Sequence, residues 1–267
     1  MNTTNTLPIY QVDAFAYQQF KGNPAAVCLL GEWLEDELLQ NIAAENNLSE
    51  TAFIVTKEGA YSIRWFTPTT EVDLCGHATM AAAHVLFEHL QYNQSKILFN
   101  SPRSGVLEVT KEANDRLTLN FPAQKIEMIP PSQKLDTALG TAVHGTYKSS
   151  DDIMIVVGSE NEVRHLTPNL TALGQLPYRG IIVTAKGDTV DFVSRFFGPA
   201  VGIEEDPVTG SAHTKLIPYW AKKLGKDTLH AQQLSARGGD LYCQLQGDRV
   251  LISGRAVTYM KGEIFIR

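Results

Sequence analysis

Five ionisable side chains in this sequence have the chemistry needed to move a proton: Glu50, Cys75, His77, Asp206 and His213. Carboxylate and imidazole groups take up and return protons near neutral pH when burial or a neighbouring charge shifts their pKa. A cysteine can do the same as a thiol and thiolate pair. The residue types therefore indicate acid–base chemistry.

Each of these side chains also has an ordinary structural explanation. Glu50 could simply form an ion pair with Arg64. His77 could be a hydrogen-bonded core histidine, and Cys75 a small buried apolar residue. Asp206 could serve only to make an Asp-Pro turn. The sequence leaves both explanations open for each residue.

Two glycines, Gly76 and Gly210, each stand directly before an apolar run with helical character. Glycine lets a ligand approach the backbone closely, and the first N–H groups of a helix are unpaired and electropositive. Ser211 is a good N-cap residue, whereas His77 is a poorer one. Two such helix starts facing one cleft would bind an anion, most simply a carboxylate. The predicted substrate-binding residues are Cys75, Gly76, Thr209, Gly210 and Ser211.

Motifs for other chemistries are missing from the sequence. It contains no Gly-x-Gly-x-x-Gly after a strand, no Walker loop, no Cys-x-x-Cys pair, no His-Glu-x-x-His and no Gly-x-Ser-x-Gly. His84 and His89 are both on an apolar run but do not form a metal-ligand set. We therefore expect no organic cofactor and no metal.

Composition and charge narrow the class further. The net charge of -6 gives no basic surface for nucleic acid. No apolar run approaches the roughly 20 residues of a membrane span, and the first residues lack the pattern of a signal peptide. Three cysteines, an odd number, fit free thiols in a reducing compartment. We expect a cytoplasmic protein without membrane or nucleic-acid partners.

The elements that must position these residues occur twice. Four segments recur in the same order after about 130 residues, which indicates two copies of one structural unit. The paired segments are 51–59 with 180–187, 64–68 with 195–199, 76–78 with 210–212, and 101–105 with 235–239.

Hydrophobic periodicity predicts how each copy is built. Helices are expected over 33–46, 77–90 and 211–224, with a kink near Pro218, and short alternating strands fill most of the rest. A helix that is apolar on all sides needs a sheet wrapped around it. We therefore predict an α+β fold of two similar halves, each a mostly antiparallel, barrel-like sheet around a central helix. The expected halves are 1–122 and 123–267, and the last strand could return to the first half.

Six segments carry a family resemblance: 10–15, 22–27, 48–53, 64–68, 74–79 and 205–213. Together they resemble the phenazine-biosynthesis PhzF-like isomerases, which have the diaminopimelate-epimerase-like fold, and the resemblance covers nearly the whole chain. It implies an active site between the two halves, no metal or organic cofactor, and a homodimer. The founding member isomerises a dihydro-hydroxyanthranilate.

The resemblance also implies roles for individual residues. Glu50 looks like the acid/base group that moves a proton between substrate carbons, with a pKa raised by burial. His77 and Asp206 look like its polar neighbours at the substrate, and together these three form the predicted catalytic set. Racemases of this fold use two opposed cysteines, but here only Cys75 is present, because Pro207 and Val208 stand where the second thiol belongs.

Three hypotheses follow. The first is a cofactor-independent isomerase that moves a proton on a small carboxylate substrate in the cleft between the halves. The second is an epimerase or racemase that uses the single thiol of Cys75. The third is a metabolite-binding protein without turnover. Neither the substrate nor a chemical role of Cys75 follows from the residues.

Overall fold

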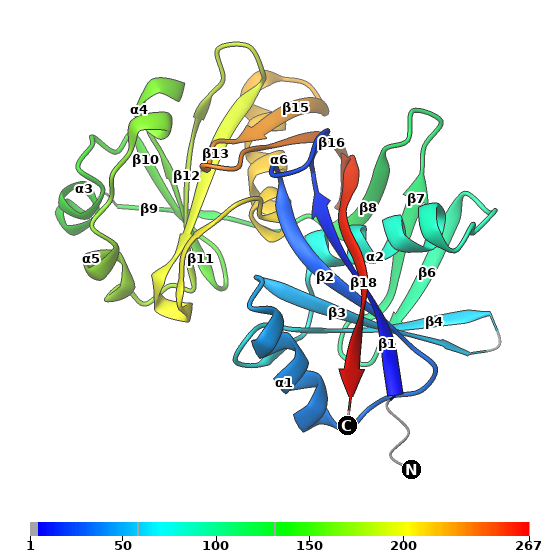
Figure 1. Cartoon of the computed structure of the whole chain (residues 1–267). Helices are drawn as coiled ribbons and strands as arrows, with labels where there is room; N and C mark the ends of the chain where they lie inside the picture. The colour runs from blue at the N-terminus through cyan, green and yellow to red at the C-terminus, as the bar shows by residue number, and fades with distance from the viewer. Residues whose placement is uncertain (1–4, 58, 131, 267) are drawn as a thin grey trace. The chain divides into compact units, whose positions relative to one another are not determined.

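The computed structural model describes residues 5–57, 59–130 and 132–266. The chain divides into two compact units, Met1–Asn120 with Ser253–Arg267, and Phe121–Ile252 (Figure 1). In each unit a long helix packs on a mixed, mainly antiparallel sheet. The last strand thus joins the first unit, an arrangement that the sequence left open.

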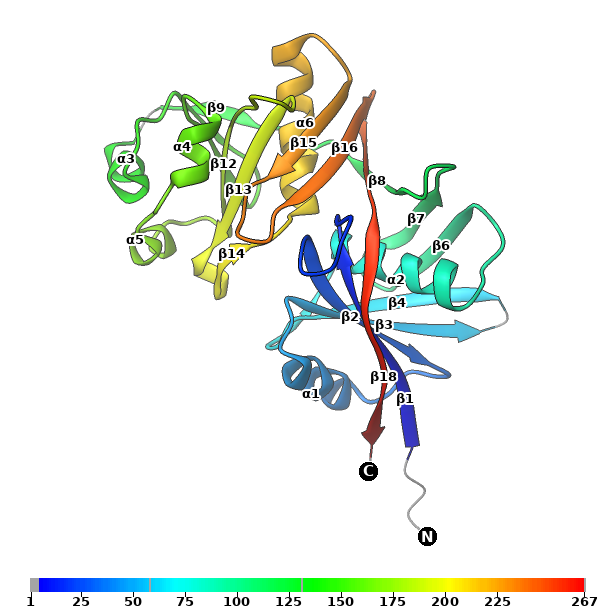
Figure 2. The same ribbon diagram turned by 45° about the horizontal axis from the view of Figure 1, so that its top comes forward.

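The first unit is built mainly from strands. Their bounds are β1 (Asn5–Ala14), β2 (Asn23–Leu30), β3 (Glu50–Lys57), β4 (Ala60–Phe66), β5 (Glu71–Val72), β6 (Lys96–Ser101), β7 (Gly105–Lys111), β8 (Leu117–Pro122) and β18 (Ala256–Ile266). The pairing order is β18-β1-β2-β3-β4-β6-β7-β8, with β5 on β4. Among the described residues of this unit, the parallel pairs are β2 with β3 and β4 with β6. Both views show β1 and β18 side by side (Figures 1 and 2).

Two helices accompany this sheet. Helix α2 (Gly76–His89) packs on β1, β2 and β3 and is buried along most of its length, including the run from His77 to Ala83. This confirms the central helix that the apolar run predicted. Helix α1 (Asp36–Asn46) buries only Leu39, Ile42 and Ala43, which belong to an apolar cluster of this unit. No helix among the described residues is long and apolar enough to cross a membrane.

The second unit has more short elements. Its strands are β9 (Glu127–Ile129), β10 (Gly145–Lys148), β11 (Asp152–Val156), β12 (Gly180–Lys186), β13 (Phe192–Gly198), β14 (Ile203–Asp206), β15 (Thr228–Gln233), β16 (Gly239–Gln246) and β17 (Arg249–Gly254). Its helices are α3 (Gln133–Leu139), α4 (Glu160–His165), α5 (Leu170–Gly174), the short 3-10 turn η1 (Pro199–Val201) and α6 (Gly210–Leu224). Apolar side chains of α3, α4 and α5 join those of β11 and β12 in one core cluster.

The strand pairings of the second unit repeat those of the first. The order is β9-β10-β11-β12-β13-β15-β16, with β14 on β13. The parallel pairs in the described part of this unit are β11 with β12 and β13 with β15. Each parallel pair has its counterpart in the first unit, so the topology agrees with the internal repeat seen in the sequence.

Helix α6 continues through Pro218 to Leu224. Proline has no N–H to donate to the carbonyl four residues earlier, that of Thr214. The carbonyl of Thr214 instead accepts a hydrogen bond from the Gln124 N–H at 3.0 Å. A strand connection thus satisfies the group that Pro218 leaves open, which lets the helix run on.

Candidate active site

The structure brings three of the predicted residues of the first unit together. Glu50 begins β3, Cys75 is the N-cap of α2, and His77 lies in its first turn. His77 Nε2 lies 3.2 Å from Glu50 Oε2, and His77 Nδ1 lies 3.5 Å from Cys75 Sγ. Cys75 and His77 are buried and Glu50 is partly buried. A carboxylate, an imidazole and a thiol therefore share one small site.

Asn23, the first residue of β2, decides where the proton of His77 sits. Its amide nitrogen lies 3.2 Å from His77 Nδ1 and can only donate, so Nδ1 is an acceptor. Burial lowers the pKa of His77 to about 3, so the ring is neutral and its one proton is on Nε2. Nε2 is buried and has no aligned hydrogen-bond partner among the described residues. The ring thus presents an N–H next to Glu50 that a ligand can accept.

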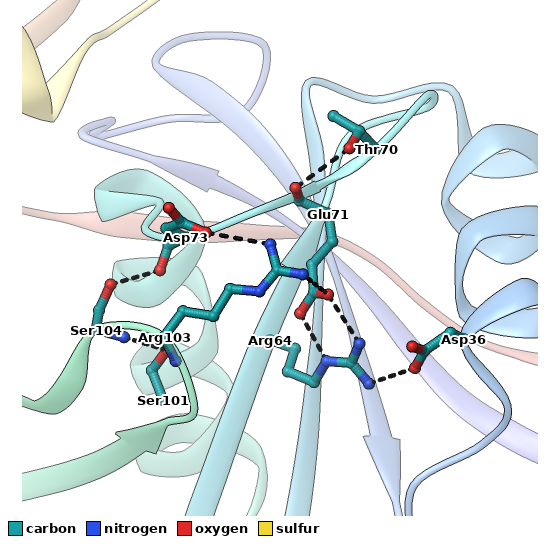
Figure 3. Close-up of polar contacts among 8 residues, drawn as sticks. All are labelled: Asp36, Arg64, Thr70, Glu71, Asp73, Ser101, Arg103 and Ser104. Carbon is teal, nitrogen blue, oxygen red and sulfur yellow. Dashed lines mark hydrogen bonds and ion pairs between the residues drawn. The ribbon is translucent and has the colours of Figure 1, made fainter.

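The start of α2 is held by a carboxylate and two arginines (Figure 3). Arg64 on β4 binds both oxygens of Glu71, at 2.7 and 2.9 Å. Arg103 bonds Glu71 at 2.7 Å and Asp73 at 3.1 Å. Because this network fixes the segment directly before Cys75, it positions the N-terminus of α2.

The partners of Arg64 show whether Glu50 is its ion-pair partner. Arg64 donates to Glu71 and to Asp36, at 2.8 Å, rather than to Glu50. The alternative that Glu50 serves only as an ion-pair partner of Arg64 is therefore wrong. The side chain of Glu50 faces His77 instead.

The second unit gathers the other predicted residues at the start of α6. Asp206 ends β14, and its carboxylate accepts a 2.5 Å hydrogen bond from the Thr209 hydroxyl. Gln233 on β15 accepts from the Thr209 N–H at 2.9 Å and donates to the Asp206 carbonyl at 2.8 Å. All three residues are buried. The buried amide therefore holds the turn from Asp206 to Thr209 in place.

The expectation that Ser211 caps the second helix is wrong. Thr209 is the N-cap, because α6 already begins at Gly210, and Ser211 is an exposed residue in the first turn. The Thr209 side chain makes no capping hydrogen bond, since its hydroxyl binds Asp206. Cys75, the N-cap of α2, makes none either. Neither helix start has its N–H groups covered by its own N-cap side chain.

His213 is placed one turn into α6, where it is fully buried. Its Nδ1 lies 2.8 Å from the carbonyl of Thr209, so Nδ1 carries the proton. In the first unit the Thr79 hydroxyl makes the same bond to the Cys75 carbonyl at 2.6 Å. Burial lowers the pKa of His213 to about 4. His213 therefore bonds the first turn of α6 in the way that Thr79 bonds the first turn of α2.

The two units differ at the position of Glu50. Strand register pairs Phe53 with Arg64 and Val183 with Arg195, which places Gly180 where the first unit has Glu50. A Cβ on Gly180 would lie 2.1 Å from an atom of Phe196. Only the first unit therefore carries a carboxylate at this position.

A buried ion pair lies near Gly180 in the second unit. Asp152 Oδ2 accepts from Lys215 Nζ at 2.8 Å and from Arg179 at 2.7 Å. Arg179 also lies 3.3 Å from the Ser211 hydroxyl. Asp152 and Lys215 are almost wholly buried. This pair ties the first turns of α6 to β11.

Sequence reasoning missed three residues that shape these sites: Asn23, Gln233 and Lys215. Asn23 carries a local signal, since an amide between Gly22 and Pro24 opens a strand. Lys215 stands next to the apolar stripe of α6, and a lysine at such a position indicates a buried acidic partner. Gln233 has no local signal, because its contacts come from residues 24 to 27 positions away.

Comparisons with known proteins cover nearly the whole chain. The model of the family described as "Phenazine biosynthesis-like protein" matches residues 12–262. An uncharacterised isomerase of Pseudomonas aeruginosa is 54% identical over 97% of this chain and 98% of its own. The crystal structure of a PhzF-family phenazine biosynthesis protein of Enterococcus faecalis is 49% identical, with a TM-score of 0.95, and covers 98% of this chain and 100% of that one.

A more distant likeness concerns the fold alone. A hydroxyproline epimerase of Agrobacterium vitis, solved with trans-4-hydroxy-L-proline, has a TM-score of 0.69 at 11% identity and covers 100% of this chain and 94% of that one. Together with the closer structure it confirms the predicted α+β fold of two similar halves.

Proposed function

Because this chain belongs to the phenazine biosynthesis-like protein family, we propose that it is a cofactor-independent isomerase acting on a small carboxylate substrate. The relative from Pseudomonas aeruginosa carries the name isomerase. The observation that supports the proposal most is the 3.2 Å contact between the Glu50 carboxylate and the neutral imidazole of His77. A carboxylate beside a fixed N–H donor suits a group that accepts a proton.

The proposed reaction moves one proton within the substrate. Glu50 takes a proton from one substrate carbon, and the electron pair of the broken C–H bond forms a new double bond. Glu50 then returns the proton to a second carbon, so the enzyme ends in its starting state. The Nε2–H of His77 would hydrogen-bond the substrate or the carboxyl group of Glu50 during the transfer. Asp206 completes the proposed catalytic set.

The proposed carboxylate binding uses the helix starts. The N–H groups after Cys75 and Thr209 are not capped by those side chains, and the positive end of a helix dipole favours an anion. Gly76 and Gly210 carry no side chain, so a carboxylate can approach the backbone at either residue.

The first prediction tests Glu50. Glu50→Gln keeps the shape of the side chain but cannot carry a proton, so turnover should fall by about 100- to 10,000-fold. Small unsaturated and amino carboxylates are incubated with the protein in deuterated water, and deuterium incorporation is followed by proton NMR. Glu45→Gln, which changes an exposed carboxylate on α1 of the same unit, is the matched control and should exchange like the parent. Unchanged exchange in Glu50→Gln would contradict the proposal.

A second candidate function rests on the 3.5 Å contact between Cys75 Sγ and His77 Nδ1. This contact suits a single-thiol epimerase, in which Cys75 would carry the proton. Cys75→Ser distinguishes the two mechanisms in the same exchange assay. Retention of much of the exchange supports Glu50 as the carrier, whereas complete loss in a folded variant supports the thiol.

A further inference from the structure

Glu50, Cys75 and His77 all have side chains that can bind a metal ion, and the proposed proton transfer gives Cys75 no role. One ligand atom from each residue lies within 4.8 Å of the others. Zinc is the divalent ion that combines thiolate, imidazole and carboxylate ligands most readily. Among the described residues this is the one such group of three.

The ligand atoms of the group lie close to the spacing that a single ion needs. Two ligands that share a tetrahedral zinc ion lie about 3.3–3.6 Å apart, given metal–ligand distances of about 2.0–2.3 Å. Glu50 lies 3.2 Å from Nε2 of His77, whereas Cys75 lies 3.5 Å from Nδ1, the other ring nitrogen. A zinc ion uses one ring nitrogen of His77, so one of the other two ligands must shift toward it.

The surroundings of His77 also suit a ligand. Its Nε2 is buried without an aligned hydrogen-bond partner among the residues that the structure describes. Asn23 lies at the other ring nitrogen, Nδ1, where a metal-bound histidine needs an outer hydrogen bond. When a metal binds Nε2, the ring proton moves to Nδ1, so the Asn23 amide must turn and offer its oxygen there to hold the ring.

We propose that Glu50, Cys75 and His77 bind Zn²⁺ and that the bound ion inhibits proton transfer. On binding, the Cys75 thiol proton leaves to solvent and the thiolate, imidazole and carboxylate each give one electron pair to the ion. Glu50 then has no free basic oxygen on that side for a substrate proton. Three protein ligands leave a fourth position for water. Only the inhibition rests on the proposed isomerase function; zinc binding stands by itself.

The test uses the purified full chain, freed of metal and titrated with Co²⁺, a coloured substitute for zinc. One equivalent should give a thiolate-to-cobalt charge-transfer band and the visible bands of a four-coordinate site, and Zn²⁺ should displace both. Mg²⁺ should displace neither, because a hard ion prefers oxygen ligands. Zinc affinity is measured by competition with a chromophoric chelator.

Substitutions in the group test whether its residues are the zinc ligands. Cys75→Ser should abolish the charge-transfer band, and both Cys75→Ser and His77→Gln should weaken zinc binding by about 100-fold or more, since loss of outer-shell partners alone costs about 10- to 100-fold. Cys28→Ala removes another buried cysteine of the same unit and should keep the band. A band that survives Cys75→Ser, or the absence of one-to-one binding, would overturn the proposal. These spectra need no substrate, so they remain informative if the isomerase assignment fails.

Discussion

At the scale of single residues, the candidate site of the first unit depends on the tautomer of His77. The buried amide of Asn23 makes Nδ1 an acceptor, which leaves the proton of the neutral ring on Nε2 beside Glu50. A histidine without that neighbour could present a lone pair to Glu50 instead. Asn23 is thus a positioning residue for the site.

This role of Asn23 predicts a change in the ring rather than in the fold. In Asn23→Ala the loss of one hydrogen bond, about 1 kcal/mol, should move the tautomer ratio of His77 toward Nδ1–H by about fivefold. Nitrogen-15 NMR of the imidazole measures that ratio directly. Asn46→Ala, which removes a bond to Thr51 in the same unit, is the control and should leave the ratio unchanged. An unaltered ratio in Asn23→Ala would disprove the role.

At the scale of elements, the residue cluster of each unit depends on how a long helix begins. The segment before α2 is fixed by the carboxylate of Glu71 and two arginines, and the turn before α6 by the amide of Gln233. The ion pair between Lys215 and Asp152 also fixes helix α6. A buried ion pair adds little net stability, but removing one partner leaves an uncompensated charge.

The cost of removing one partner of this ion pair predicts the effect of a substitution in α6. Lys215→Met should destabilise the protein by about 3 kcal/mol, the low end of the range for a broken buried pair, because Arg179 still bonds Asp152. Urea unfolding followed by circular dichroism measures the loss. Lys222→Met on an exposed part of the same helix should change stability little. The double variant Lys215→Met with Asp152→Asn should recover much of the loss, and failure to recover it would argue against the ion pair as the cause.

At the scale of the whole molecule, both units share one strand topology but carry different side chains at an equivalent position. In each unit, the strand that follows the first parallel pair carries an arginine that donates hydrogen bonds to a glutamate. These pairs are Arg64 with Glu71, and Arg195 with Glu205 at 2.6 and 2.9 Å. The diaminopimelate-epimerase-like fold predicted from the sequence is confirmed by the solved relatives. The carboxylate of Glu50 has no counterpart at Gly180, so the duplication repeats the fold but not this side chain.

Buried neutral histidines in both units predict how the stability of the molecule depends on pH. The pKa of His213 falls from 6.5 to about 4 on folding because the ring is buried. Between about pH 6.5 and 4 the unfolded chain therefore binds a proton that the native protein does not, and stability falls as the pH falls. Above that window His213 contributes no pH dependence.

The size of this effect is testable with one variant. His213 should contribute about 3 kcal/mol of pH-dependent stability across the window. His213→Gln keeps a donor for the Thr209 carbonyl but cannot be protonated, so its unfolding free energy should change less between pH 6.5 and 4. Exposed His165 supplies the control variant, His165→Gln, with the profile of the parent. Parallel profiles for His213→Gln and the parent would refute the prediction.

The sequence by itself determined the repeat, the central helices, the α+β fold and the family, because apolar periodicity, turn residues and motif spacing are local properties of the chain. It also singled out Glu50, Cys75 and His77, whose side-chain types indicate acid–base chemistry. Only the tertiary structure decided that Arg64 binds Glu71 and not Glu50, that Thr209 rather than Ser211 begins α6, and that Asn23 sets the proton of His77. Such pairings join residues distant in the chain, where burial and strand register choose the partner and no local pattern records the choice.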